Sequence, residues 1–363
     1  MTNTRRGFLK GAAASGIAFC SCGLLEAAHA QGQRPVRQAV AVGGRRVKTI
    51  DIHAHCVFAD VAARLGAQAG PPPATVRGTE ETVIRLDQRL AAMDAQKVDM
   101  EVLSVNPYWY GMNPDLARQV VAINNEKMAE FCAANSERFA GFCSLTLQQP
   151  ELAVQELETA MRRQGLKGAA IGGNVNNVEF ADPKFHPVWA KAEELGAVLF
   201  IHPGGVPQLA QRFRGNGWLG NTIGNPLDTT IALSHLIFSG TLDRFPNLKV
   251  IAAHGGGFLA SYADRSDHAC MVNPRECDAS VQLKKKPTEY LKQLYFDSLV
   301  FSPEAIRHLQ AQVGAGQIVL GSDYPFPWQL APVDHIFACD SLSEEEKRGV
   351  LGETAAKLLR IQT

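Results

Sequence analysis

Five side chains that can bind a metal each lie at the end of a short apolar run. His53 and His55 close the first run as His-Ala-His, and His202, His254 and Asp323 each close a later one. Residues two apart on a strand share a face, so His53 and His55 are expected to point the same way. Imidazole with carboxylate suits zinc, and also manganese or iron. The pattern predicts a metal centre, with zinc as the expected ion.

Each of these residues has a simpler explanation when it is taken alone. His202 precedes Pro-Gly-Gly and could merely end a strand, His254 precedes three glycines and could lie in a turn, and Asp323 could cap a helix before Pro325. Their joint placement favours the metal centre. Four other histidines fall in helix-like stretches and are expected to be solvated or structural: His186, His235, His308 and His335. His268 stays open.

The runs that carry these residues belong to an alternating pattern. Eight apolar runs have the length and composition of buried parallel strands: residues 49–55, 100–105, 139–147, 168–172, 198–202, 250–254, 294–300 and 318–323. Helix-like segments lie between them, at 81–96, 113–136, 150–164, 183–194, 226–243 and 303–313. Eight βα units predict a (β/α)8 TIM barrel, whose catalytic groups sit at the C-terminal strand ends.

The segment after the first strand is unusually long. Residues 59–79 contain three consecutive prolines and lack a clear helical or strand pattern. We expect an irregular insertion loop over the active-site face of the barrel.

The N-terminus resembles an export signal. Arg5 and Arg6 precede a modest apolar run, and Ala28-His29-Ala30 supplies an A-x-A exit. The arginine pair predicts a twin-arginine signal over residues 1–30 and a periplasmic or secreted protein, with an ordinary secretory signal as the alternative. The apolar run is too weak for a spanning helix. Residues 31–48 are expected to be a linker or an added strand pair before a catalytic domain over 49–363.

Composition adds few constraints on function. The 363 residues are 46% hydrophobic, and 36 basic residues balance 36 acidic ones. This chain length allows one large barrel, and the charge balance excludes the basic surface of a nucleic-acid or membrane-surface binder. The expected partner is a small-molecule substrate.

The cysteines are scattered and lack the spacing of a metal finger. Cys270 and Cys277 could close a short disulfide in an oxidising compartment, or could stay reduced. Cys56, Cys132 and Cys143 sit among apolar neighbours and are expected to be small buried residues.

The order of the ligands along the chain resembles that of the amidohydrolase superfamily. The nearer resemblance is to the branch of aminocarboxymuconate-semialdehyde decarboxylase and the resorcylate and vanillate decarboxylases. It runs from about Thr49 to the C-terminus. The segments that carry it are IDIHAH at 50–55, HGGG at 254–257 and LGSDYPFP at 320–327, with FSG at 238–240 and YFDS at 295–298.

This resemblance implies residue roles and a homodimer. His53, His55, His202 and Asp323 would hold the metal, and His254 would be the catalytic base. Arg265 would grip a substrate carboxylate, in some members across a subunit interface. The bridging lysine of binuclear members is missing from residues 170–174, which favours a single metal. The arginine that the semialdehyde decarboxylase uses after its first strand has no clean match, although Arg77 and Arg85 lie nearby.

We therefore expect a non-oxidative decarboxylase of an aromatic or conjugated small acid, without an organic cofactor. Asp323 would protonate the carbon that loses CO2, and Phe326 and Trp218 would wall the substrate or, alternatively, pack in the core. A metal-dependent hydrolase of an ester, lactone or amide is the second hypothesis, because one site supports both reactions. A non-catalytic periplasmic binding protein is the third, and the complete ligand set argues against it.

Overall fold

The computed structural model describes residues 36–72 and 74–362. The predicted export signal over residues 1–30 lies outside the described residues. Within the described part, no helix combines the length and apolarity needed to cross a membrane.

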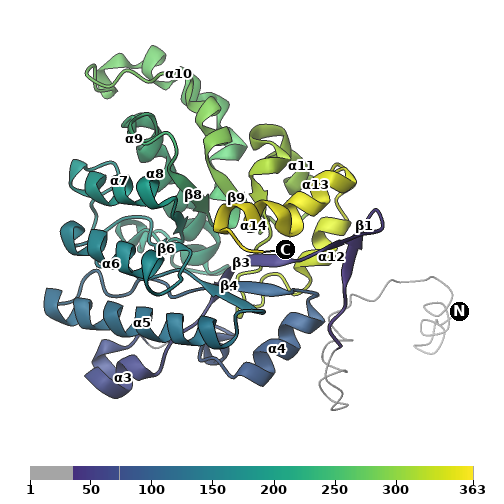
Figure 1. Ribbon diagram of the computed structural model, residues 1–363. Helices are drawn as coiled ribbons and strands as arrows, with labels where there is room; N and C mark the ends of the chain where they lie inside the picture. The colour runs from purple at the N-terminus through teal and green to yellow at the C-terminus, as the bar shows by residue number, and fades with distance from the viewer. Residues whose placement is uncertain (1–35, 73, 363) are drawn as a thin grey trace, which may run out of the picture. The chain divides into compact units, whose positions relative to one another are not determined.

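Eight parallel strands form the centre of the described chain (Figure 1). In chain order they are β3 (Ile50–His55), β4 (Met100–Ser104), β5 (Phe139–Gly141), β6 (Gly168–Ile171), β7 (Val198–Ile201), β8 (Lys249–Ala252), β9 (Tyr295–Asp297) and β10 (Ile318–Val319). They pair as a three-stranded sheet, β3-β4-β5, and a five-stranded sheet, β6-β7-β8-β9-β10. Seven of the eight strands fall within the predicted runs, and β8 begins at Lys249, one residue before its run.

Backbone hydrogen bonds join the two sheets at both junctions. Cys143, just after β5, bridges Ala169 of β6, and Ala54 of β3 bridges Tyr324, just after β10. At the second junction the N–H of Ile52 donates to the carbonyl of Leu320 at 3.0 Å. The eight strands therefore make the predicted barrel.

Helices surround the barrel on the outside (Figure 1). They are α3 (Asp60–Leu65), α4 (Leu86–Ala95), α5 (Pro114–Ala134), α6 (Pro150–Arg162), α7 (His186–Leu195), α8 (Asn225–Phe238), α9 (Thr241–Arg244), α10 (Asp264–Val272), α11 (Pro303–Val313), α12 (Pro332–Phe337), α13 (Glu344–Arg348) and α14 (Thr354–Leu359). Local sequence sets several of the boundaries. Asn113 and Ser302 cap α5 and α11 by accepting backbone N–H groups, and proline follows each of them.

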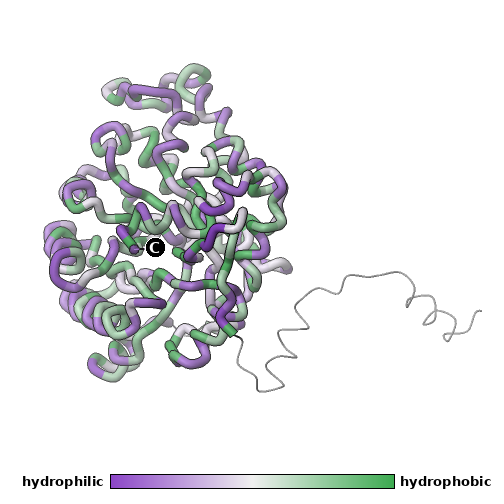
Figure 2. Tube along the Cα trace, turned by 45° about the vertical axis from the view of Figure 1, so that its right-hand side comes forward, coloured by the Kyte–Doolittle hydropathy of each residue, from purple (hydrophilic) through white to green (hydrophobic). Residues whose placement is uncertain are grey.

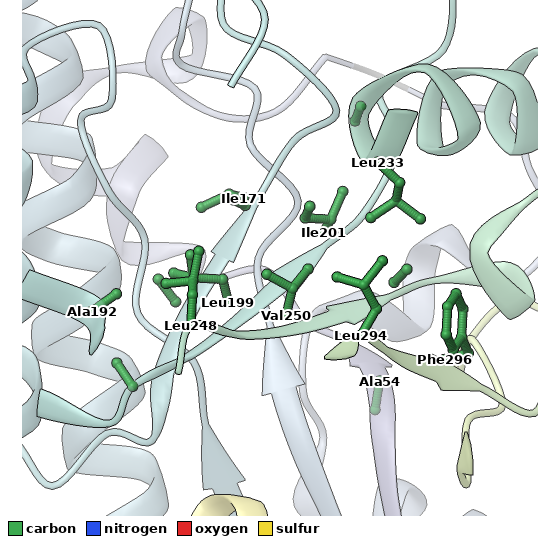
Figure 3. Close-up of a cluster of buried hydrophobic side chains, with 14 of the residues drawn as sticks. Ala54, Ile171, Ala192, Leu199, Ile201, Leu233, Leu248, Val250, Leu294 and Phe296 are labelled. Atoms are coloured by element: carbon green, nitrogen blue, oxygen red, sulfur yellow. The ribbon is translucent and has the colours of Figure 1, made fainter. Parts of the chain in front are cut away.

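The hydrophobic core has two layers. Side chains such as Ile52, Val198 and Phe200 fill the barrel interior, and α14 packs against this cluster. A second layer lies between the strands and the helices and includes Leu199 and Ile201, the alternate residues of β7 (Figure 3). Hydrophilic residues gather along the outer helices (Figure 2). The strands are thus buried on both faces, as their continuous apolar composition predicts.

Residues 40–47 form a strand pair. β1 (Val40–Val42) and β2 (Arg45–Val47) are antiparallel, which settles this stretch of the predicted linker in favour of the strand-pair alternative. The Asp99 carboxylate anchors the pair by accepting hydrogen bonds from Arg46 at 2.8 Å and from the Thr49 backbone at 2.9 Å. Burial opposes ionisation of Asp99, but these hydrogen bonds hold its pKa below the ordinary value.

The segment after β3 is more regular than predicted. The short helix α3 and two 3-10 turns, Ala67–Ala69 and Thr79–Thr82, lie within or at the end of the expected insertion. The expectation of a wholly irregular loop was wrong because residues 60–65 combine buried Val61 with helix-forming alanines. Val76 and Arg77 from this segment line a surface cavity with Trp218 and Trp328.

Helix α10 stands out from the body of the described chain (Figure 1). It has no buried residue, and Met271 and Val272 at its end are 71% and 76% exposed. Cys270 in its last turn is disulfide-bonded to Cys277, which decides the question that the sequence left open. Cys56 and Cys143 are buried as expected, whereas Cys132 is only partly buried.

Candidate metal centre

Two metal-binding histidines come from β3, and an extra residue in that strand directs them inward. Asp51 pairs with Glu101 but Ala54 pairs with Leu103, so β3 gains one residue relative to β4 between these positions. Such a bulge changes the face that the following side chains occupy. His53 and His55 consequently meet at the barrel mouth, with their Nε2 atoms 3.0 Å apart.

His202 and Asp323 complete the group from the five-stranded side. His202 directly follows β7, and its ring centre lies 4.6 Å from that of His55. Asp323 follows β10, and its Oδ1 lies 2.8 Å from Nε2 of His55 and 3.2 Å from Nε2 of His53. One donor atom from each of these four buried residues lies within 4.8 Å of the others. We call His53, His55, His202 and Asp323 the metal cluster.

The cluster residues fit a divalent cation. Both ring nitrogens of His202 are buried without a hydrogen-bond partner among the described residues, although buried polar atoms are normally paired. His53 and His55 use their Nδ1 atoms elsewhere, on Asp297 at 2.6 Å and on Ser104 at 3.0 Å. Their Nε2 atoms therefore face the cluster, as metal-ligating histidines with outer hydrogen-bond partners do.

Electrostatics in the cluster favour a neutral His55 and His202 beside an ionised Asp323. Burial lowers the pKa of His55 to about 4 and holds that of His202 well below its usual value. Burial also opposes ionisation of Asp323, but the neighbouring histidines outweigh it and hold its pKa well below the ordinary range. His53 differs, because the carboxylates of Asp323 and Asp297 overcome its burial and raise its pKa to about 10.

His254 stands beside the cluster with a different exposure. It follows β8 with a φ of 57°, its side chain is 15% exposed, and its Nε2 lies 3.6 Å from Oδ2 of Asp323. Together with Asp323, Phe301 and Trp328 it lines a cavity of about 140 Å³, which we call the metal cavity. The His254 side chain is more exposed than the ligand side chains, although Asp323 lines the same cavity.

The predicted substrate-binding residues Phe326, Trp218 and Arg265 differ in their distance from the metal cluster. The Phe326 ring lies 5.8 Å from that of His55. Trp218 stacks on Trp328 at 5.7 Å and is 48% exposed, so its core-packing alternative was wrong. Arg265 is exposed in the first turn of α10, where its guanidinium lies 5.9 Å over the Tyr262 ring. The described residues that line the metal cavity include no lysine or arginine.

Sequence reasoning missed three residues that shape the site. Phe301 and Trp328 line the metal cavity, and Asp297 contacts both His53 and the backbone of His254. Asp297 ends β9, so the rule that found the other strand-end residues could also have identified it. The two aromatic residues lie in loops, where no strand pattern marks them.

Comparison with known proteins identifies the family to which residues 50–361 belong. The amidohydrolase family model matches residues 50–361. This chain belongs to the amidohydrolase family. Among curated relatives of this amidohydrolase, 2-amino-3-carboxymuconate-6-semialdehyde decarboxylase of Dictyostelium discoideum is 35% identical over 279 residues, or 75% of this chain and 76% of the relative.

Solved structures of decarboxylases have a similar fold. 5-Carboxyvanillate decarboxylase from Sphingomonas paucimobilis is 28% identical, with a TM-score of 0.79 over 87% of this chain and 100% of the other. A dihydroxybenzoic acid decarboxylase from Polaromonas sp., determined with bound manganese, shares the fold at 23% identity, with a TM-score of 0.73 over 87% of this chain and 97% of that one.

Proposed function

We propose that this amidohydrolase is a metal-dependent, non-oxidative decarboxylase of an aromatic or conjugated small carboxylic acid. The observation that carries the proposal is the buried metal cluster, whose member Asp323 lines a cavity together with His254 and the aromatic residues Phe301 and Trp328. The decarboxylases among its relatives support this reaction class. A bound divalent cation would supply Lewis acidity to hold and polarise the anionic substrate. Three imidazoles and a carboxylate suit zinc first, with manganese and iron as alternatives.

The chain's own residues would handle the proton. Decarboxylation breaks the bond to the carboxyl group, leaves the electron pair on carbon and releases CO2, so that carbon must gain a proton. The Oδ1 of Asp323 faces the ligand histidines, and its Oδ2 lies 3.6 Å from Nε2 of His254. Because the pKa of Asp323 is strongly lowered, it can donate a proton only after receiving one. We propose that His254 supplies this proton to Asp323.

Arg265 would read a carboxylate on the substrate from a second copy of the chain. The metal cavity has no cationic side chain among its described lining residues, whereas Arg265 is exposed on the projecting helix α10. A homodimer that brings α10 of one copy over the cavity of the other would supply the bidentate partner that an acid substrate needs. Phe326 and Trp218 would border the same substrate space.

We also propose that residues 1–30 direct export by the twin-arginine route to the periplasm. The Cys270–Cys277 disulfide supports an oxidising location, because such bonds persist there. Replacing Arg5 and Arg6 with lysine should leave the uncleaved protein in the cytoplasm. Unchanged export from cells without twin-arginine machinery would contradict this route and favour the general secretory one.

The reaction class is tested by following the carboxyl carbon. The purified protein, loaded with zinc or manganese, is incubated with hydroxybenzoic and conjugated acids that carry a ¹³C-labelled carboxyl group, with His254→Ala as the control. Release of labelled CO2 by the wild type alone supports the decarboxylase. Turnover of esters, lactones or amides without CO2 release would replace it with the hydrolase hypothesis.

A further inference from the structure

Asp297 is a buried carboxylate with an unusual set of partners. It ends β9 with no solvent exposure. It accepts hydrogen bonds from the His53 ring at 2.6 Å, and from the backbone N–H groups of His254 at 2.9 Å, Gly255 at 2.8 Å and Leu299 at 3.1 Å. One side chain therefore touches a metal ligand and the turn that carries the proposed proton-transfer residue.

The contact with His53 selects its tautomer. An ionised carboxylate only accepts hydrogen bonds, so Nδ1 of His53 must carry the proton that points at Asp297. When a cation displaces the second proton, the neutral ring offers its lone pair on Nε2, which is the nitrogen that faces the metal cluster. The other tautomer would direct an N–H at the cation and could not bind it.

The contact with the following turn fixes His254. His254 and Gly255 both have positive φ, 57° and 61°, and their successive N–H groups converge on the two oxygens of Asp297. Such paired N–H groups form a concave anion site. A positive φ is unfavourable for a residue with a Cβ, so His254 needs a partner that holds this backbone. The turn keeps the His254 ring beside Asp323.

We infer that Asp297 is a positioning residue that couples the metal ligand His53 to the placement of His254. This inference rests on the proposed function for the role of His254, but its effect on metal binding is independent of that role. Replacing the Asp297 carboxylate with an amide should disturb both the His53 ring and the turn that carries His254. The amide can accept on one atom only. Its N–H donors would therefore face either His53 and the His254 N–H, which share Oδ2, or the N–H groups of Gly255 and Leu299, which share Oδ1.

The test is the substitution Asp297→Asn in the full-length protein. We expect zinc affinity, measured by competition with a chromogenic chelator, to fall about 10- to 100-fold. At saturating zinc, kcat on an acid substrate should fall roughly tenfold or more, with little change in KM, because His254 is displaced rather than lost. Unchanged zinc affinity with only a lower melting temperature would overturn the inference and leave Asp297 a structural residue.

Asp51→Asn is the matched control. Asp51 is equally buried and accepts the backbone N–H groups of His53 and Ser322 and the Ser322 hydroxyl, but none of its hydrogen bonds with described residues involves an imidazole. We expect this variant to lose thermal stability while keeping its zinc affinity. An equal loss of zinc affinity in both variants would contradict a role specific to Asp297.

A measurement on the wild type covers the case in which Asp297→Asn fails to fold. In the zinc-loaded protein labelled with ¹⁵N-histidine, the His53 ring should show a protonated Nδ1 and a metal-bound Nε2. A His53 ring with the proton on Nε2 would refute the coupling. If no acid is turned over, the zinc affinities and the tautomer still decide the role of Asp297, while the proposed function alone fails.

Discussion

Exposure separates the four ligand residues of the metal cluster from His254, the proposed proton-transfer residue. The ligands His53, His55, His202 and Asp323 are buried, whereas the His254 side chain is 15% exposed and lines the metal cavity together with Asp323. A general acid–base group needs access to the substrate, and a ligand needs shielding from competing water. The burial pattern therefore fits the different roles that we propose for the neighbouring imidazoles.

His254→Ala should retain the metal and lose most turnover. General acid–base groups typically supply about 10²- to 10⁴-fold in rate, so kcat should fall by that range. Elemental analysis of the purified variant and steady-state kinetics on a carboxylic acid substrate measure the two effects. A metal-free variant that regains activity when metal is added back would make His254 a ligand.

Arg265→Lys should slow the turnover of an acid substrate by more than tenfold, which corresponds to about 1.4 kcal/mol on the reaction barrier. Lysine keeps the charge but cannot reproduce the planar fork of a bidentate contact. The melting temperature should not change, because Arg265 is exposed and its contact with the Tyr262 ring is on the surface.

Complementation tests the dimer that this role requires. Mixing Arg265→Ala chains with His254→Ala chains should restore part of the activity, because one of the two sites in a hybrid dimer is then intact. Wild-type kinetics for Arg265→Lys would leave Arg265 as a surface residue outside the site.

At the scale of elements, the order of the strands along the chain was enough to predict most of the site. His53, His55, His202, His254 and Asp323 were found because parallel strands in a barrel end on one face, so sequence position alone brings them together. The extra residue in β3 was not predictable, because it depends on pairing with β4. The role of Asp297 depends on side-chain contacts from β9 to β3, which no spacing reveals. The proposed role of Arg265 would depend on a subunit interface, which one sequence does not define.

The hairpin β1–β2 offers a test of stability away from the site. Asp99→Ala should lower the free energy of unfolding by about 1–3 kcal/mol, because the buried Thr49 N–H and the Arg46 guanidinium lose their acceptor. Since the folded-state pKa of Asp99 is lowered, its contribution is present above the ordinary aspartate value of about 3.9 and is lost as pH falls below it. The melting temperatures of wild type and variant should converge in acid.

Asp334→Ala provides the control for the Asp99 substitution. Asp334 pairs with Lys97 on the surface and is 54% exposed, so its loss should hardly change stability. A Tm for Asp99→Ala equal to that of this control, or a gap that widens in acid, would contradict the anchoring role.

For the whole molecule, the cluster geometry predicts one divalent cation per chain. The four ligand residues converge on a single point, and residues 170–174 offer no bridging lysine for a second ion. Mass spectrometry of the native protein and elemental analysis should both give one equivalent. Two equivalents, or none after supplementation, would contradict a mononuclear site.

The division of the barrel into two sheets gives the metal a mechanical role. His53 and His55 belong to the three-stranded sheet, while His202 and Asp323 follow strands of the five-stranded one. An ion bound by all four residues would therefore cross-link the two sheets and stabilise the junction between β3 and β10. At a hundredfold excess over its dissociation constant, such an ion adds about 2.7 kcal/mol to the folded state. Chelation should then speed deuterium uptake at the amides of Ile52 and Asp323, which bridge this junction, and spare that of Ala170 at the opposite one. Equal acceleration of deuterium uptake at both junctions would mean that the ion stabilises the whole barrel and not the β3–β10 junction in particular.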